Sequence, residues 1–121
     1  KQLPVSVPSH CALMHPAAER MRERLKQLKI ETPRIPVLHN AHVQAESNAD
    51  AIRGALVRQV ESPVRWVETI QKMATDGVDK LVECGPGKVL AGLNKRISKE
   101  TQTLSVYDPE TLRQARAALG A

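Results

Sequence analysis

The stretch Val78-Asp-Lys-Leu-Val-Glu-Cys-Gly-Pro-Gly-Lys-Val-Leu-Ala-Gly-Leu93 decides the fold class, because it predicts a strand, a turn and a helix in succession. Residues 78–84 form a short apolar run bounded by glycine, as expected of a buried strand. Gly85-Pro86-Gly87 turns the chain, and apolar residues then recur at helical spacing as far as Ile97. Strands that alternate with helices in this way are typical of a parallel α/β sheet.

The same alternation extends in both directions along the chain. Residues 1–9 have the period-two pattern of an edge strand or a strand end. A short strand or extended segment is expected at 35–38, and a last strand at 101–107. We predict an α/β fold with a parallel sheet of three or four short strands. Helices are expected to begin near Pro16, Ser47, Ser62-Pro63 and Asp108-Pro109. The inward faces of the first three are expected at Ala18, Met21, Leu25 and Leu28, at Ile52, Ala55, Leu56 and Val60, and at Trp66, Val67, Ile70, Met73 and Ala74.

Length and composition fit one globular domain or a piece of a larger one. The 121 residues are 41% hydrophobic and 26% charged, and no apolar run approaches the ~18 residues of a membrane span. Cys11 and Cys84 fit no paired-cysteine pattern and are expected to be buried free thiols in a reducing cytoplasm. The net charge of +5 comes with no Phe, one Trp and one Tyr, which argues against a base-stacking surface for nucleic acid.

The histidines are the first candidates for chemistry. His10 stands where the strand pattern ends and a helix begins, and a rigid scaffold can aim a proton-transfer group from such a position. A partly exposed structural histidine is the plainer interpretation of that position taken alone. His10 and His15 are five residues apart, and His39 and His42 are three apart. Because no zinc-binding spacing is met, no metal site is expected.

Two other common sites are missing from the pattern. Gly85-Pro86-Gly87-Lys88 lies between a strand and a helix like a phosphate-binding turn, but it lacks the spacing of GxxxxGK[ST] or GxGxxG. Its glycines are therefore expected to serve backbone geometry. No Gly-x-Ser-x-Gly elbow occurs, so the sequence shows no recognisable nucleophile.

Three ordered blocks of sequence resemble the malonyl-CoA:acyl carrier protein transacylases of bacteria. Leu3-Pro-Val-Ser-Val-Pro-Ser-His-Cys-Ala-Leu-Met14 resembles the segment of that family that carries its active-site histidine. Asp50-Ala-Ile-Arg-Gly-Ala-Leu-Val-Arg-Gln59, followed by Ser62-Pro-Val-Arg-Trp66, resembles the next block. Glu83-Cys-Gly-Pro-Gly-Lys-Val-Leu90, with Gly92-Leu-Asn-Lys-Arg-Ile97, resembles the carboxy-terminal block. With their intervals, these blocks cover nearly the whole chain.

The resemblance implies an α/β-hydrolase-like large subdomain with an inserted ferredoxin-like small one. Residues 1–9 would be the end of the small subdomain, and residues 10–121 the C-terminal part of the large one. The serine elbow and the arginine that binds the malonyl carboxylate lie upstream in the family. This segment alone is therefore predicted to be inactive and to need the upstream segment of the same enzyme.

The activity implied by the resemblance is transfer of a malonyl group from malonyl-CoA to the pantetheine thiol of acyl carrier protein. The reaction belongs to cytoplasmic fatty acid biosynthesis, passes through an acyl-serine intermediate and needs no further cofactor. His10 would be the general acid/base. The main-chain carbonyl of Gln59 would orient it, in place of the more usual aspartate.

Further positions acquire expected roles from the same resemblance. Ser9 matches a position associated with extender-unit choice. Lys88, Lys95 and Arg96 would face the acidic carrier protein, although a solvated helix face is the plainer interpretation. Polyketide-synthase relatives tend to read Gly-Pro-His-Pro where this chain has Gly-Pro-Gly-Lys, which favours the fatty-acid enzyme. The competing hypothesis is a non-catalytic module that binds carrier protein or CoA through a basic surface.

We predict that the isolated 121 residues do not fold cooperatively. Three or four parallel strands leave an exposed sheet edge and an uncovered sheet face, both of which destabilise a parallel sheet. Thermal unfolding of the isolated chain, followed by circular dichroism, should show a broad, non-cooperative change. A sharp sigmoidal melt would contradict this expectation.

Overall fold

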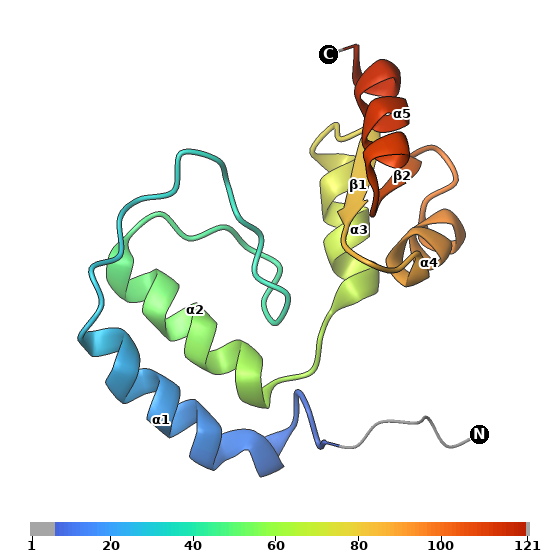
Figure 1. Cartoon of the computed structure of the whole chain (residues 1–121). Helices are drawn as coiled ribbons and strands as arrows, with labels where there is room; N and C mark the ends of the chain where they lie inside the picture. Colours follow the sequence, from blue (N-terminus) through green and yellow to red (C-terminus); the bar gives the residue numbers. More distant parts are fainter. Residues whose placement is uncertain (1–6, 121) are drawn as a thin grey trace. The chain divides into compact units, whose positions relative to one another are not determined.

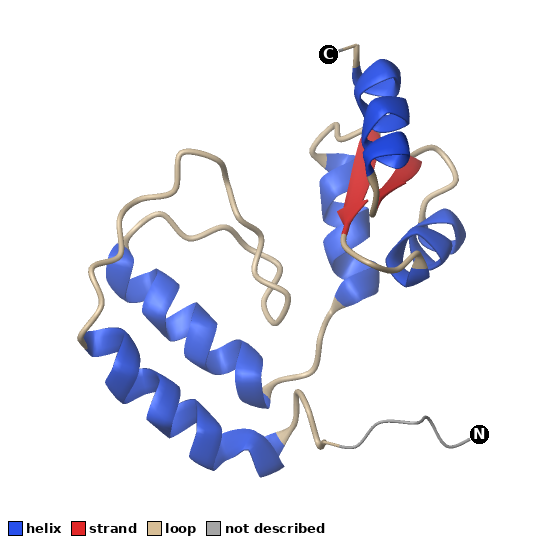
Figure 2. Ribbon diagram, viewed as in Figure 1, coloured by secondary structure: helices blue, strands red, loops and turns tan. Residues whose placement is uncertain are grey.

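The computed structural model describes residues 7–120, and the chain divides into two compact units, residues 1–66 and 67–121. The first unit is built on helices, and the second contains a small parallel sheet with helices packed on it (Figure 1, Figure 2). The edge strand expected at 1–9 lies mostly outside the described residues, and residues 7–9, which are described, form no strand. Within the described part, no helix has the length and apolar character needed to cross a membrane.

The first unit is an antiparallel pair of helices. A short 3-10 helix (η1, Ala12–Met14) leads into α1 (His15–Lys26), which packs against α2 (Ala49–Glu61). Pro16 occupies the first turn of α1, as predicted, because its missing N–H has no partner to lose there. The core between the two helices consists of Ala18, Leu25 and Val57, with Ile30, Leu56 and Val60 packed against it.

The first turn of α2 is capped one residue later than predicted. The side chain of Asn48, and not that of Ser47, accepts a hydrogen bond from the backbone N–H of Ala51 at 2.8 Å. Asn48 has extended backbone angles, φ −99° and ψ 152°, which place its side-chain oxygen over the first turn. The loop before it is pinned by a single antiparallel bridge between Leu38 and Ala45, where a strand at 35–38 was expected.

The end of α2 also differs from the prediction. Ser62 is the C-terminal cap of α2, with φ −116° and ψ 147°, and α3 (Trp66–Thr75) begins four residues later. The prediction that Ser62-Pro63 begins a helix is therefore wrong. The residue before a proline is driven into the extended region, so Ser62 leaves the helix. The N–H of Arg65 is then donated to the carbonyl of Asn40 at 2.8 Å, away from the helix.

Arg53 fixes the register of α2 against α1. Its guanidinium donates to the carbonyl of Leu25 at 3.0 Å, in the last turn of α1, and to the carbonyl of Leu28 at 2.8 Å, two residues after the end of that helix. A third N–H of the same group is bonded to the carboxylate of Asp50 at 2.9 Å. The carbonyl of Leu25 also accepts from the N–H of Leu28 at 3.2 Å, so Arg53 adds a further donor at the end of α1. Its second bond, to Leu28, joins α2 to the segment just after α1, and the two bonds together stabilise the pairing of the helices.

In the second unit, α3 is followed by two parallel strands with a helix after each. β1 (Lys80–Cys84) pairs with β2 (Gln102–Val106) in the register that joins Lys80 to Gln102 and Cys84 to Val106. α4 (Val89–Ile97) follows β1, and α5 (Pro109–Leu119) follows β2. The α/β class and the parallel pairing are as predicted, but the described residues contain two paired strands instead of three or four.

The turns of this unit explain where its elements begin. Gly77, with φ +89°, ends α3, and the N–H of Val78 bonds to the carbonyl of Met73 at 2.9 Å. β1 therefore begins at Lys80 and not at Val78, because Val78 belongs to the helix-ending turn. Gly85 starts the turn into α4. Its φ of +145° is a backbone angle that residues with a side chain rarely adopt.

Polar groups hold both strand–helix connections. The carboxylate of Glu83, on β1, accepts from the N–H groups of Leu90 at 3.2 Å and Ala91 at 2.8 Å, in the first turn of α4. Asp108 and Thr111 form a reciprocal capping box at the start of α5, as the sequence Asp-Pro indicated. The backbone N–H of Thr111 lowers the pKa of the Asp108 carboxyl by bonding to its charged form.

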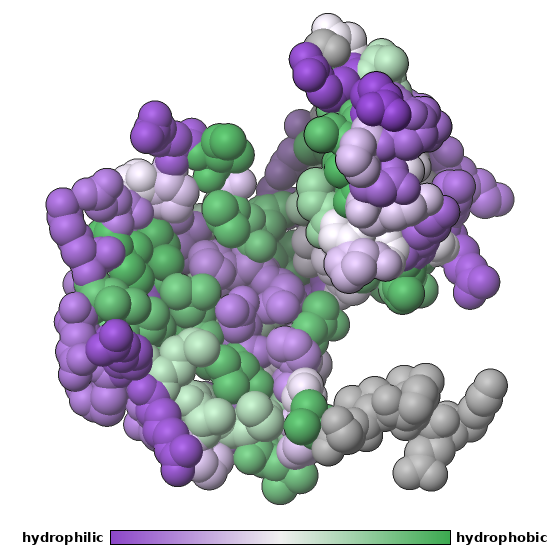
Figure 3. All heavy atoms as spheres, viewed as in Figure 1, coloured by the Kyte–Doolittle hydropathy of each residue, from purple (hydrophilic) through white to green (hydrophobic). Residues whose placement is uncertain are grey.

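Several apolar side chains expected inside are exposed. Ile70, Ala91 and Ala115 form the buried apolar set of the second unit, whereas Val67 is 51% exposed and Leu93 40%. In the first unit Met21 and Leu28 are also exposed. Figure 3 shows hydrophobic side chains in contiguous groups on the visible surface of the first unit. Cys11 and Cys84 are free thiols, as predicted, but neither is buried: Cys11 is partly exposed and Cys84 is exposed.

Replacing Arg53 with methionine should destabilise the fold by about 1–3 kcal/mol, because the carbonyl of Leu28 loses the arginine N–H and the carbonyl of Leu25 loses one of its donors. Chemical denaturation of the wild type and the variant measures this difference. Arg58→Met is the matched control, since Arg58 is exposed on the same helix. Equal losses of stability in the two variants would contradict the role given to Arg53.

Candidate functional site

His10 is held by a hydrogen bond to a main-chain carbonyl far along the chain. Its Nδ1 lies 2.7 Å from the carbonyl oxygen of Gln59. A carbonyl can only accept, so Nδ1 carries the proton and the neutral ring leaves Nε2 with a free lone pair. His10 is exposed, so that lone pair is open to a reacting group. A histidine fixed in this tautomer can take a proton at Nε2 and return it.

The end of α2 explains why this carbonyl is available. Gln59 is the third residue from the end of α2, and the last four carbonyls of a helix have no partner within it. The carbonyl of Gln59 therefore needs a donor from outside the helix, and His10 provides one. This carbonyl also lies at the C-terminal end of α2, where the helix dipole is negative.

The backbone at His10 is itself unusual. His10 has φ +58°, in the left-handed region that a side chain rarely adopts. The turn is supported by the thiol of Cys11, which donates to the carbonyl of Pro8 at 3.2 Å, and by the N–H of Ser9, which donates to the carbonyl of Val7 at 2.9 Å. A non-glycine residue held at positive φ is a feature of functional turns, where it aims a side chain.

A second histidine lies beside the first on the same helix pair. His15, the first residue of α1, has its Nδ1 2.7 Å from a carboxylate oxygen of Glu61, the last residue of α2. The hydrogen bond and the charge of Glu61 raise the pKa of His15, and Glu19 adds to the rise while Arg22 opposes it. The end of α2 is thus bonded to the start of α1 through His15, and to the turn before η1 through His10.

The other two histidines form a separate cluster in the loop before α2. The rings of His39 and His42 stack with centroids 5.4 Å apart, and Nε2 of His42 lies 3.0 Å from a carboxylate oxygen of Glu46. Burial lowers the pKa of His39, and the neighbouring His42 lowers it further. Among the described residues, no group of three His, Cys, Asp or Glu side chains has a metal-binding arrangement.

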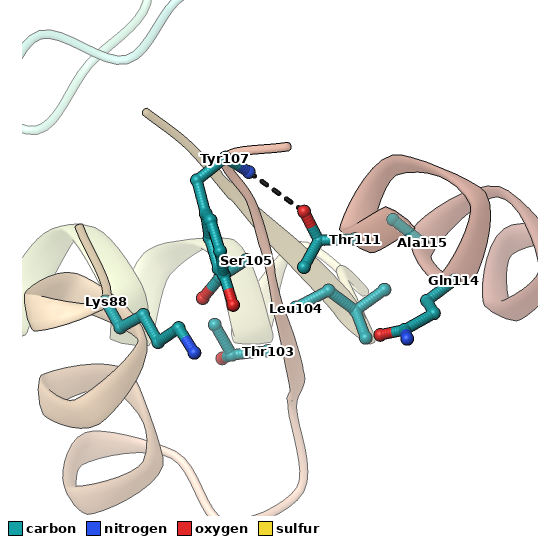
Figure 4. A pocket seen from close by; sticks show the side chains of 8 residues that line it. All are labelled: Lys88, Thr103, Leu104, Ser105, Tyr107, Thr111, Gln114 and Ala115. Carbon is teal, nitrogen blue, oxygen red and sulfur yellow. Dashed lines mark hydrogen bonds between the residues drawn. The ribbon is translucent and has the colours of Figure 1, made fainter. Parts of the chain in front are cut away.

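The three basic residues expected to face a carrier protein have different surroundings. Lys88 lies with its ammonium 4.6 Å from the centroid of the Tyr107 ring, and Tyr107 raises its pKa. Both residues line a pocket of about 240 Å³ between β2 and α5, which Figure 4 shows. Lys95 and Arg96 are exposed in the last turn of α4, where cations suit the helix dipole.

Known proteins resemble this chain over nearly all of its length. The malonyl CoA-acyl carrier protein transacylase of Haemophilus influenzae is 59% identical over 106 residues, which are 88% of this chain and 34% of that protein. The solved structure of the corresponding transacylase from Coxiella burnetii aligns with a TM-score of 0.93 at 44% identity, over 100% of this chain and 38% of that one. The chain is a homologue of the C-terminal portion of malonyl CoA-acyl carrier protein transacylases.

A second transacylase structure includes a partner protein. The malonyl-transacylase that was solved in complex with a type II polyketide synthase acyl-carrier protein aligns with a TM-score of 0.92 at 46% identity. That alignment covers 96% of this chain and 38% of the transacylase. This chain thus spans a little over a third of the transacylases it matches. No family model matches it.

Two histidines contact the end of α2, and only one of these contacts was predicted. His10 and the carbonyl of Gln59 are brought into contact from 49 positions apart in the sequence, as the resemblance to transacylases implied. Glu61 and His15 were not predicted as a pair. The only signal for it in the sequence is that Glu61 lies two residues after Gln59, and His15 five after His10.

Replacing Glu61 with glutamine should lower the pKa of His15 towards its ordinary value of 6.5, because the charge and the strong acceptor are both lost. In the wild type the raised pKa means that the pair stabilises the fold fully below pH 6.5, and that this stabilisation is lost as pH rises through the folded-state pKa. A ¹H–¹³C titration of the His15 ring measures the shift. An identical midpoint in Glu61→Gln would contradict the pairing.

Proposed function

We propose that this chain provides the general acid/base half of a malonyl CoA-acyl carrier protein transacylase, with His10 as the proton-transfer residue. The observation that carries the proposal is the 2.7 Å contact between Nδ1 of His10 and the carbonyl of Gln59. It fixes the tautomer that leaves Nε2 free, as the aspartate does in a serine–histidine–aspartate triad. The similarity to transacylases at 59% identity supports the same assignment.

The first half-reaction would load the malonyl group onto a serine. The hydroxyl of a serine outside this chain attacks the thioester carbon of malonyl-CoA while Nε2 of His10 takes the hydroxyl proton. The tetrahedral adduct then collapses, the carbon–sulfur bond breaks, and CoA leaves as a thiol that carries the proton from Nε2. The product is a malonyl-serine ester, and His10 is neutral again.

The second half-reaction would transfer the malonyl group from the serine to acyl carrier protein. The pantetheine thiol of acyl carrier protein gives its proton to Nε2 and attacks the ester carbonyl, forming a new carbon–sulfur bond. The serine oxygen leaves and recovers the proton from His10. In both halves the imidazolium forms transiently, and the carbonyl of Gln59 at the negative end of α2 stabilises it.

The part of the transacylases that this chain does not span would supply the rest of the site. We place there the serine elbow and the arginine that binds the malonyl carboxylate. Residues 10–121 would then be the C-terminal part of an α/β-hydrolase-like large subdomain, and residues 1–9 the end of a ferredoxin-like small one. The apolar side chains exposed on both units support this, because surfaces of that kind normally lie against other protein.

Three further roles belong to the same proposal. Ser9 stands directly before His10 in the exposed turn, where a side chain could contact the acyl group. Lys95 and Arg96 offer two exposed positive charges on one helix turn, which suits an acidic carrier protein. Lys88 contributes a charge whose ammonium packs over Tyr107. A non-catalytic module would use the same basic residues but would have no need of an oriented His10.

Replacing His10 with alanine in the full-length parent should slow malonyl transfer from CoA to carrier protein by about three orders of magnitude or more. The reason is that the serine loses the base that accepts its proton. His10→Gln is the matched variant, since its amide can still donate to the carbonyl of Gln59 but cannot take up a proton. Both variants should be slow. Transfer at the wild-type rate in either would exclude the enzymatic role of His10 and favour the binding module.

A further inference from the structure

If α2 continued as a helix, the carbonyl of Gln59 would normally accept a hydrogen bond from a backbone N–H one turn later. In an α-helix the carbonyl of residue i accepts from the N–H of residue i+4, so the partner of Gln59 would be residue 63. Residue 63 is proline, which has no backbone N–H. If α2 continued as an α-helix, residue 63 would therefore have no N–H to donate to this carbonyl in competition with His10.

The other carbonyls at the end of α2 differ in this respect. Arg58, Val60 and Glu61 would find their partners at residues 62, 64 and 65, all of which have a backbone N–H. Among the last four residues of α2, Gln59 is the one whose carbonyl would have no N–H donor four residues later. The proline is thus in register with the one carbonyl that contacts His10.

Pro63 acts on the backbone before it as well. The ring atoms of a proline clash with a helical conformation of the preceding residue, and Ser62 is extended with φ −116° and ψ 147°. The chain then leads to Arg65, whose N–H is donated to the carbonyl of Asn40 at 2.8 Å. α2 therefore ends at Glu61, and the next segment turns towards Asn40. The carbonyl of Gln59 is then left accessible to His10.

We propose that Pro63 is a positioning residue for the transfer reaction, which keeps the carbonyl of Gln59 reserved for Nδ1 of His10. The inference rests on the proposed function, since it concerns the orientation of the general base. Pro63 contacts no reacting atom in this account. It acts by removing the competing donor and by forbidding the helical turn at Ser62 that would bring another donor near.

The size of the effect follows from the competition between two donors. An alanine at residue 63 restores an N–H and relaxes Ser62, so a backbone bond to Gln59 can compete with the bond from His10. Because the net stabilisation by one such bond is modest, we expect kcat to fall by about tenfold or less, with KM for malonyl-CoA nearly unchanged. This is much smaller than the effect of removing His10.

The decisive comparison is Pro63→Ala against N-methylalanine at the same position, both in the full-length parent. N-methylalanine lacks the proline ring, but its N-methyl group removes the N–H and clashes with a helical Ser62 as the proline does. We expect the alanine variant to lose activity and the N-methylalanine variant to stay within about twofold of wild type. Pro36→Ala, which removes a proline from the exposed loop of the same unit, should also resemble wild type.

A spectroscopic measurement tests the positioning itself. In protein labelled with ¹⁵N-histidine, the wild type and the N-methylalanine variant should show His10 protonated at Nδ1, whereas Pro63→Ala should show a mixture of the two neutral tautomers. Should the alanine variant fail to fold, the N-methylalanine variant decides: retained transfer supports the proposal, and lost transfer overturns it.

The outcomes separate this inference from the proposed function. Full kcat in Pro63→Ala with an unchanged tautomer would overturn the role of Pro63 while leaving His10 as the base. An equal loss in the alanine and N-methylalanine variants would overturn it too, since ring packing would then be the cause. Wild-type transfer in His10→Ala would instead overturn the proposed function.

Discussion

The hydrogen bond between Nδ1 of His10 and the carbonyl of Gln59 depends on the packing of α1 against α2. Three features converge on it: the left-handed turn at His10, the end of α2 with its unpaired carbonyls, and the register of the two helices. A shift of α2 by one residue would turn another carbonyl, in another direction, towards the ring. The position of the His10 ring therefore depends on the register of α1 and α2.

The helix pair is joined by polar contacts at both ends of its apolar core. At one end Arg53 bonds to the carbonyl of Leu25 in α1 and to that of Leu28 just after it, and at the other end Glu61 bonds to His15. The core between them is small, with Ala18, Leu25 and Val57 as its buried members. Small cores define register weakly, because apolar contacts are not directional. Directional hydrogen bonds at the two ends supply what the core lacks.

The elements of the fold were largely predictable, whereas the site was predictable only through family resemblance. The strand–turn–helix from β1 to α4 and the cap at Asp108 were read from local pattern, since glycine, proline and capping residues act over a few positions. The prediction that a helix begins at Ser62-Pro63 was wrong, because the same residues can end one helix or begin another. The backbone contact between Arg65 and Asn40, which are far apart in the sequence, holds the segment outside a helix. Gln59 leaves no mark in the sequence, because any residue has a carbonyl.

A carbonyl cannot be removed by changing a side chain, so the most direct test replaces the backbone. Putting the α-hydroxy analogue of valine at residue 60 turns the carbonyl of Gln59 into an ester carbonyl, which is a weaker acceptor. We expect kcat of the full-length parent to fall relative to a control ester placed one residue earlier, at residue 59, while Gln59→Ala keeps wild-type turnover. Equal kcat in the two ester variants would contradict the claim that this carbonyl orients His10.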